Sequence, residues 1–194
     1  RNDVDVLCAS LRAMRGELDF AAALRTRVAL LKGLDLSALQ ACYSQRVTLN
    51  PGAKALVATM KAHGARCVLV SGGFRFFTSR VAQAAGFPTD RANTLIDDGK
   101  LLTGAVAEPI LGREAKLAAL RDEAAAIGAT LTDAVALGDG ANDLDMIRAA
   151  GLGIAYKAKP IVAAETIARI EYTDLTAALF FQGYAEEEVL VQDR

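Results

Sequence analysis

The sequence predicts an α/β fold in which a doubly wound, mostly parallel sheet carries helices on both faces. Between about residues 48 and 184, short apolar runs of strand length alternate with stretches of helical periodicity. Two of the apolar runs end in polar, glycine-rich segments, and ligands bind open α/β sheets at such strand ends. The 194 residues are enough for one core domain and a small attached module.

Composition excludes several functional classes. The net charge of −1 predicts neither a nucleic-acid partner nor an anionic membrane surface. No apolar run approaches the roughly 20 residues of a membrane span, and no secretory signal opens the chain. Cys8, Cys42 and Cys67 lie in apolar surroundings, which indicates buried thiols in a reducing, cytoplasmic compartment. The single histidine, His63, leaves little for a Ser-His-Asp or multi-histidine metal mechanism.

The N-terminal part, from about residue 12 to residue 46, is predicted to be helical. Leu24 and Val28 recur at helical spacing, and Gly33 ends this helix. A second helix is expected over residues 34–42.

The core begins with a helix that Asn50 caps and Pro51 starts. Residues 66–70 form an apolar run that predicts a buried strand, and the Ser-Gly-Gly-Phe run of residues 71–74 follows at its end. A hydroxyl and unhindered glycine N–H groups at a strand-to-helix turn suit a phosphate group, although a serine cap on a glycine turn has the same pattern. The next helix is predicted over residues 76–86.

Residues 93–110 are predicted to form a β-hairpin. Two apolar segments, residues 94–96 and 101–103, flank an Asp-Asp-Gly-Lys turn at residues 97–100. A helix is expected over residues 112–126.

An acidic run follows the next predicted strand, residues 134–137. Glycines on either side of Asp139 break the strand, and Asn142 and Asp143 stand where a helix begins. Crowded carboxylates repel one another unless a cation intervenes, and their hard oxygens suit Mg²⁺. An Asp-Gly turn with a capped helix would also explain the run. Beyond it we expect a strand at residues 151–155 and helices at 160–168 and 174–181.

These runs resemble the haloacid dehalogenase (HAD) superfamily, and within it the phosphoserine phosphatases. The resemblance covers residues 12–184 and rests on the GDGxND run at residues 138–143, on Ser71 to Phe74, and on the segment from Met14 to Phe20. It implies a Rossmann-type three-layer core with a small helical cap. It also implies Mg²⁺-dependent hydrolysis of O-phosphoserine to serine and phosphate, the last step of serine biosynthesis.

The resemblance also implies a role for each matching residue. Asp139 would bind Mg²⁺, while Asp143 would support the metal shell or the neighbouring lysine. Lys116 would neutralise charge around the phosphate. The residues implied in substrate binding are Met14 and Phe20 (shielding from water), Arg27 (the substrate carboxylate), and Ser71, Gly72, Gly73 and Asn142 (the phosphate group).

The resemblance identifies no residue of this chain as the attacking aspartate. Asp3 and Asp5 match the family's D-x-D spacing, but no apolar strand precedes them and they stand too close to Met14. We therefore expect the printed chain to begin inside the cap and to lack the strand that carries the nucleophile. By itself it would then be inactive and marginally stable, because neighbouring strands would lack ladder partners.

The expected domains are a helical cap remnant at residues 1–47, a catalytic core at 48–185 and a tail at 186–194. Two alternatives remain at this point. The protein could be a phosphatase or phosphotransferase for another small metabolite, or the chain could be a non-catalytic phosphate-binding fragment. The expected partner is a small phosphorylated amino acid, and the sequence does not indicate an oligomeric state.

Overall fold

The structure is a computed structural model that describes residues 20–190. The predictions for Asp3, Asp5 and Met14 therefore lie outside the described residues. The helices and strands are α2 (Phe20–Ala29), α3 (Leu36–Arg46), α4 (Ala53–Ala62), β1 (Val68–Phe74), α5 (Arg75–Ala85), β2 (Thr89–Asn93), β3 (Leu95–Asp97), β4 (Leu102–Val106), α6 (Arg113–Ala126), β5 (Val135–Gly138), α7 (Leu144–Ala149), β6 (Leu152–Tyr156), α8 (Pro160–Ala164), β7 (Ala168–Ile170) and α9 (Ala177–Phe180), with short 3₁₀ turns η1 (Leu131–Asp133), η2 (Ala141–Asp143) and η3 (Glu186–Glu188).

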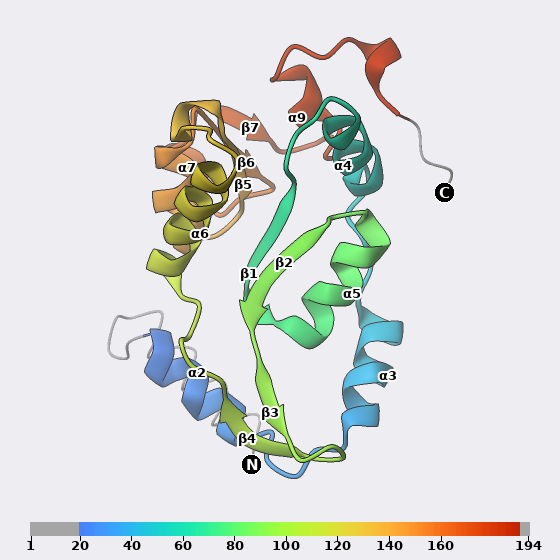
Figure 1. Ribbon diagram of the computed structural model, residues 1–194, viewed down its shortest axis with the longest axis vertical. Coiled ribbons are helices and arrows are strands. Elements are labelled where there is room, and N and C mark those ends of the chain that lie inside the picture. Colours follow the sequence, from blue (N-terminus) through green and yellow to red (C-terminus); the bar gives the residue numbers. More distant parts are fainter. Residues whose placement is uncertain (1–19, 191–194) are drawn as a thin grey trace.

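The core is an α/β structure with parallel strands, as the sequence predicts. β1 pairs with β2 in parallel, and β5, β6 and β7 form a second parallel group. Apolar residues of α4 and α9 pack on one face of the second group, and those of α7 and α8 pack on the other. The three layers are visible in Figure 1, where α6 and α7 lie on one side of the strands and α4 and α5 on the other. None of the helices described is long and apolar enough to cross a membrane.

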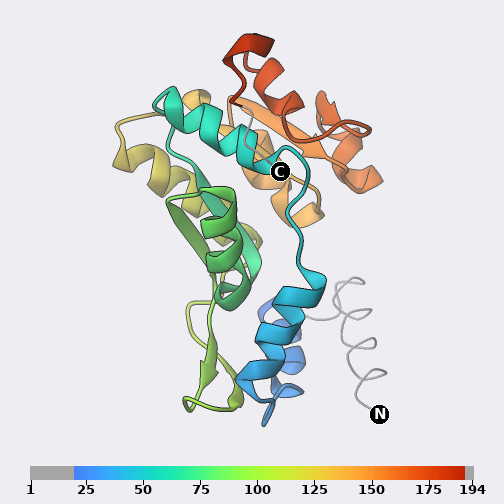
Figure 2. The ribbon, with the colours of Figure 1, turned by 90° about the vertical axis from the view of Figure 1, so that its right-hand side faces the viewer.

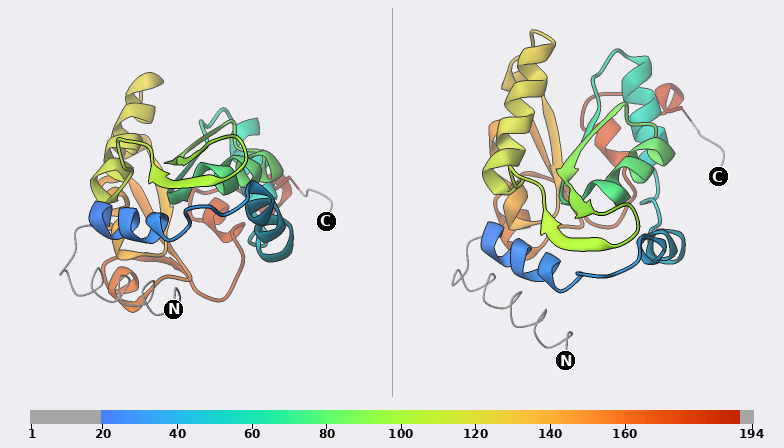
Figure 3. Two further views of the ribbon diagram at one scale, coloured as in Figure 1. Left: turned by 90° about the horizontal axis from the view of Figure 1, so that it is seen from below. Right: turned by 60° about the horizontal axis from the view of Figure 1, so that its bottom comes forward.

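Helices α2 and α3 and the β3–β4 hairpin lie together at one end of the molecule (Figures 1 and 2). Leu24 and Val28 of α2 are buried against Val106 at the end of the hairpin. Figure 3 shows α2 lying along the hairpin. The hairpin is joined to α6 by the short segment of residues 107–112, and Phe20 of α2 lies against Gly112 at the end of that segment.

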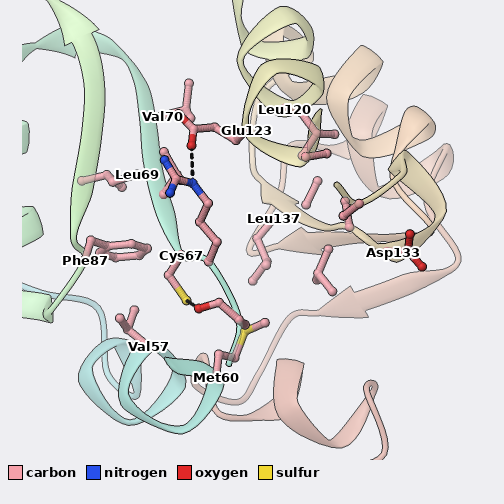
Figure 4. A pocket seen from close by; sticks show the side chains of 18 of the residues that line it. Val57, Met60, Cys67, Leu69, Val70, Phe87, Leu120, Glu123, Asp133 and Leu137 are labelled. Atoms are coloured by element: carbon pink, nitrogen blue, oxygen red, sulfur yellow. Dashed lines mark hydrogen bonds and ion pairs between the residues drawn. The ribbon is translucent and has the colours of Figure 1, made fainter. Parts of the chain in front are cut away.

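A cavity of about 460 Å³ separates the two parallel groups of strands. β1 lines one wall with residues that include Val70, and β5 lines the opposite wall with residues that include Leu137 (Figure 4). Helices α4 and α6 supply the remaining walls. No strand within residues 20–190 pairs with the edges of β1 and β5 that face this cavity, which we call the inter-strand slot.

The two strands beside the slot run in the same direction. Helix α6 begins near the end of β1, where Asn93 bonds both Gly72 and Leu111, and Lys116 on its first turns reaches Asp143 just beyond β5. The same helix ends near the start of β1. Both strands therefore run antiparallel to α6 and parallel to each other. The slot therefore lies between two parallel strands whose facing edges pair with no strand among residues 20–190.

Two strands were not predicted. β2 has the sequence Thr-Asp-Arg-Ala-Asn, which offers no apolar run. It forms because its backbone pairs with β1, from Val68 opposite Thr89 to Phe74 opposite Asn93. β7 is only three residues long and begins at Ala168, the last residue of the helix predicted over residues 160–168, whereas the observed helix α8 already ends at Ala164. In both cases pairing with a neighbouring strand outweighs local propensity.

The thiols differ from one another in exposure. Cys67 is buried, and burial raises the pKa of its thiol. Cys42 is exposed, so the prediction that it is buried is wrong, because its position on α3 faces away from the core. Cys8 lies outside the described residues.

A buried carboxylate ties α6 to the first strand pair. Glu123 accepts hydrogen bonds from Arg66 at 2.5 Å and from Arg91 at 2.9 Å. Burial by itself would raise the pKa of Glu123, but the two guanidinium groups outweigh it and hold the pKa below its ordinary value. In the unfolded protein the pKa of a glutamate is about 4.3, and above this pH the ion cluster contributes its full stability. This stability is lost as pH falls through the lower pKa that Glu123 has in the folded protein.

We expect Glu123→Gln to lower the free energy of unfolding by about 1.5–3 kcal/mol at pH 7, because it removes the charge from these hydrogen bonds. Urea unfolding of both proteins between pH 7 and pH 3 measures the difference. The gap should shrink as pH falls from the unfolded-state pKa of about 4.3 toward the lower pKa that Glu123 has in the folded protein. A gap that stays constant over this range would contradict the assignment.

Candidate active site

The acidic run folds into a compact turn at the end of β5. Asp143 is 3% exposed, and its Oδ2 accepts the backbone N–H groups of Asp139 at 3.1 Å and Gly140 at 3.0 Å. A Cβ on Gly138 would overlap the Asp143 side chain, so a glycine is required there. The Asp143 carboxylate therefore holds the turn in shape.

The other oxygen of Asp143 binds the lysine singled out in the sequence. Lys116 Nζ donates to Asp143 Oδ1 at 2.5 Å, and the two side chains are 9% and 5% exposed. The pair joins α6 to the end of β5 across 27 residues of sequence. An ammonium group is thus fixed at the strand end where the turn begins.

Asp139 differs from Asp143 in its surroundings. It is exposed, and its carboxylate has no hydrogen bond or ion pair to any residue in the range 20–190. Asn142 is half-buried, and its Oδ1 lies against Gly140, where an added Cβ would come within 2.5 Å. Within residues 20–190, the turn therefore presents one carboxylate without a partner and one amide beside a buried ion pair.

The serine-glycine run forms the second polar strand end. The structure assigns Ser71 to Phe74 to β1, with an irregularity in the pairing after Val70. Gly73 N–H donates to Ser71 Oγ at 3.0 Å. Because a hydroxyl both accepts and donates, Ser71 keeps its own O–H free to donate to a ligand.

Phe20 of α2 lies against the glycine segment of β1 and against the entry to α6. A Cβ on Gly72 would lie 3.4 Å from Phe20 Cζ, and one on Gly112 would lie 3.1 Å from Phe20 Cδ1. The ring thus covers the glycine turn of β1 and the entry to α6. Met14, the other predicted shielding residue, lies outside the described residues.

Two arginines on α2 have different partners. Arg25 forms an exposed ion pair with Glu108, with Nη2 and Oε1 2.6 Å apart. Arg27 is half-buried, and its Nε donates to Ala23 O within the same helix at 3.3 Å. Its terminal nitrogens have no partner in the described part of the chain. Of the two, Arg27 is the one available to a ligand.

A family model described as haloacid dehalogenase-like hydrolase matches residues 3–148. The chain belongs to this family.

Relatives and solved structures agree with the family match. The chain is 47% identical to a phosphoserine phosphatase from Streptomyces coelicolor, over 93% of the chain and 44% of that protein. It is 48% identical to a phosphoserine phosphatase from Streptococcus thermophilus, over 84% of the chain and 76% of that protein. A solved phospho-aspartyl intermediate analogue of phosphoserine phosphatase superposes with a TM-score of 0.80 at 38% identity, covering 91% of the chain and 84% of that structure. The chain spans less than half the length of the Streptomyces relative.

Two further sets of side-chain contacts hold the elements around the site and were not predicted from the sequence. Arg113 on α6 forms a two-point ion pair with Asp145 on α7, at 2.6 Å and 2.5 Å, and it holds the pKa of Asp145 below its ordinary value. Asn93 bonds Gly72 and Leu111. These partners are 18 to 32 residues apart in sequence, and no local pattern marks them.

The metal-binding capacity of the HAD-like turn is limited within the described residues. Among residues 20–190, no three His, Cys, Asp or Glu side chains lie together in a way that could hold a metal ion. Mg²⁺ commonly uses only one or two protein carboxylates and completes its shell with water and substrate phosphate. The free carboxylate of Asp139 fits that pattern. The carboxylate of Asp143, with three donors already bound, does not.

Proposed function

We propose that the full-length protein is a Mg²⁺-dependent phosphatase that hydrolyses O-phosphoserine to serine and phosphate, the last step of serine biosynthesis in the cytoplasm. One observation carries this proposal. A serine-glycine segment, a buried lysine-aspartate pair and an exposed carboxylate stand at the carboxyl ends of two parallel strands, and Phe20 of α2 lies against the glycine of the first. The match to phosphoserine phosphatases over most of the chain supports it.

The phosphate group is bound from two sides. Ser71 donates its hydroxyl from β1, and the Gly72 peptide allows close approach because it carries no side chain. Lys116 offsets negative charge from the side of α6, and Asp143 fixes its direction. Asn142 contributes a neutral amide from the turn after β5. These groups stabilise charge that grows on the phosphoryl oxygens during transfer.

Asp139 is the proposed magnesium ligand, and Asp143 acts through Lys116 and the turn. When bound, Mg²⁺ would neutralise charge on the phosphate oxygens and help to orient the group. Asp139 is pre-positioned for this because Asp143 accepts its backbone N–H. Its side chain remains free to turn toward the ion.

The attacking group is an aspartate on a strand that we place in the inter-strand slot. An aspartate oxygen would form a bond to phosphorus while the bond to the serine oxygen breaks, and a second acid would protonate that oxygen. Water would then cleave the acyl phosphate and restore the aspartate. The cavity is lined by Val70 and Leu137, which directly precede Ser71 and Gly138-Asp139 in the chain, so a parallel strand in the slot would bring its end toward these residues, where the reaction needs its nucleophile.

The cap selects the substrate. Phe20 covers the site and excludes water, as Met14 is also proposed to do. Arg27 pairs with the substrate carboxylate, since a guanidinium binds that group at two points. No nucleic acid or membrane takes part.

We expect Arg27→Ala to raise KM for O-phosphoserine by about 10- to 100-fold in the full-length protein, because it removes a charge-assisted contact worth about 1.5–3 kcal/mol. O-phosphoethanolamine lacks the carboxylate, so its hydrolysis should change by less than about threefold. Steady-state assays of both substrates measure this difference. Arg25→Ala is the matched control, since Arg25 is already paired with Glu108. Equal losses on both substrates would show that Arg27 only holds the cap together.

Another phosphorylated metabolite remains the main alternative on the same scaffold. A panel that includes phosphothreonine, a sugar phosphate and a nucleotide would identify it. Preference for a substrate without a carboxylate would favour that alternative over phosphoserine.

A further inference from the structure

Asn93 is a buried polar residue to which neither the sequence motifs nor the proposed reaction assigns a role. It is the last residue of β2 and is 3% exposed. Its Nδ2 donates to Gly72 O at 2.9 Å and to Leu111 O at 3.2 Å, while its Oδ1 accepts the Leu111 N–H at 2.7 Å. One side chain therefore joins the end of β1 to the segment that enters α6.

The bond to Gly72 continues to the serine hydroxyl. Gly72 O and Gly73 N–H belong to the same planar peptide group, so fixing the carbonyl also fixes the direction of the N–H. That N–H donates to Ser71 Oγ. A series of hydrogen bonds therefore connects Asn93 through the Gly72–Gly73 peptide to Ser71. It leaves the hydroxyl proton of Ser71 free to bond an anion.

The bonds to Leu111 continue to the lysine. Leu111 and Gly112 lead into α6, where Lys116 N–H donates to Gly112 O in the first turn. The Asn93 amide binds both the N–H and the carbonyl of Leu111, as the backbone of a neighbouring strand would. Asn93 therefore sets the distance between the serine on β1 and the helix that carries Lys116.

We propose that Asn93 is a positioning residue for phosphate binding, which holds the Ser71 hydroxyl and the start of α6 in register with each other. This inference rests on the proposed function of Ser71 and Lys116 as phosphate ligands. Asparagine suits the position because only an amide offers two donors and an acceptor there. Aspartate has nearly the same shape, but its oxygens would face the carbonyls of Gly72 and Leu111.

The test is a double-mutant cycle of Asn93→Asp with Ser71→Ala. Its first readout is kcat/KM for O-phosphoserine in the full-length protein, and its second is the Kd of inorganic phosphate in the same proteins. We expect Asn93→Asp alone to lower kcat/KM about 10- to 100-fold, since small misplacements of this kind are costly. In the Ser71→Ala background the same change should cost at least threefold less, because the serine through which it acts is absent.

A matched control separates positioning from general loosening of the strand. Thr78→Val removes another buried side-chain hydrogen bond to β2, the one from Thr78 Oγ1 to Asp90 at 2.6 Å. Its effect should be the same in both serine backgrounds. Asn93→Ala provides a second probe that places no charge in the site, and urea unfolding checks that each variant folds.

The inference would be overturned if Asn93→Asp changed kcat/KM and the phosphate Kd by the same factor with and without Ser71. Full activity of both Asn93→Asp and Asn93→Ala would also overturn it. A wild type that binds phosphate but does not hydrolyse phosphoserine would instead refute the proposed function. In that case the phosphate Kd values alone decide the role of Asn93, and coupling between Asn93 and Ser71 in those values supports it.

Discussion

Replacing Lys116 by methionine should destabilise the protein by about 3–5 kcal/mol and remove most of its phosphate affinity. The change leaves Asp143, 3% exposed, as a buried carboxylate without its cation, and breaking one side of a buried ion pair has this cost. Turnover of phosphoserine in the full-length protein should fall about 10²- to 10³-fold, since a positioned cation is lost from the transferring phosphate. Urea unfolding and phosphate titration measure the two effects.

The control for this prediction is Lys159→Met, an exposed lysine beyond the acidic run. It should change stability by less than about 0.5 kcal/mol. Adding Asp143→Asn to Lys116→Met should recover part of the lost stability, because the neutral amide can still accept the N–H groups of Asp139 and Gly140. A Lys116→Met variant that keeps wild-type stability and phosphate affinity would show that the buried pair has neither role.

Asp139→Asn should impair metal binding and turnover while leaving the stability of the protein nearly unchanged. The side chain is exposed and has no partner in the described residues, so the free energy of unfolding should change by less than about 0.5 kcal/mol. Removing the charge should weaken Mg²⁺ binding and lower turnover about 10²- to 10³-fold. Calorimetric titration of Mg²⁺ in the presence of phosphate, together with steady-state assays, measures both.

Glu114→Gln is the comparison for Asp139, since Glu114 is an exposed carboxylate on the first turn of α6. It should leave both Mg²⁺ affinity and turnover unchanged. If magnesium dependence were the same in Asp139→Asn as in the wild type, the metal assignment would be wrong.

The sequence predicted those parts of the fold that are encoded locally. The turn after β5 could be found because its glycines and acids are adjacent in sequence, and Asp143 folds back onto residues three and four positions away. The cap helix α2 and the parallel strands β1, β5 and β6 follow from apolar periodicity in the same way. The family match confirms the fold class.

Elements that depend on distant partners could not be predicted. β2 has no apolar run, and it forms because its backbone pairs with that of β1. The sequence gives Asn93 as the start of a hairpin, and only the fold brings it to Gly72 and Leu111. The Arg113–Asp145 pair likewise joins two helices 32 residues apart, for which one sequence alone carries no signal. The inter-strand slot is visible only once β1 and β5 are placed beside each other.

The most direct measurement is phosphate release from O-phosphoserine by the full-length protein as Mg²⁺ is titrated. The account predicts one serine per phosphate released, turnover that disappears when a chelator removes the metal and returns when Mg²⁺ is restored, and a higher kcat/KM for O-phosphoserine than for O-phosphoethanolamine. Phosphate release that is unaffected by the chelator, or that shows no preference for the substrate with a carboxylate, would contradict it.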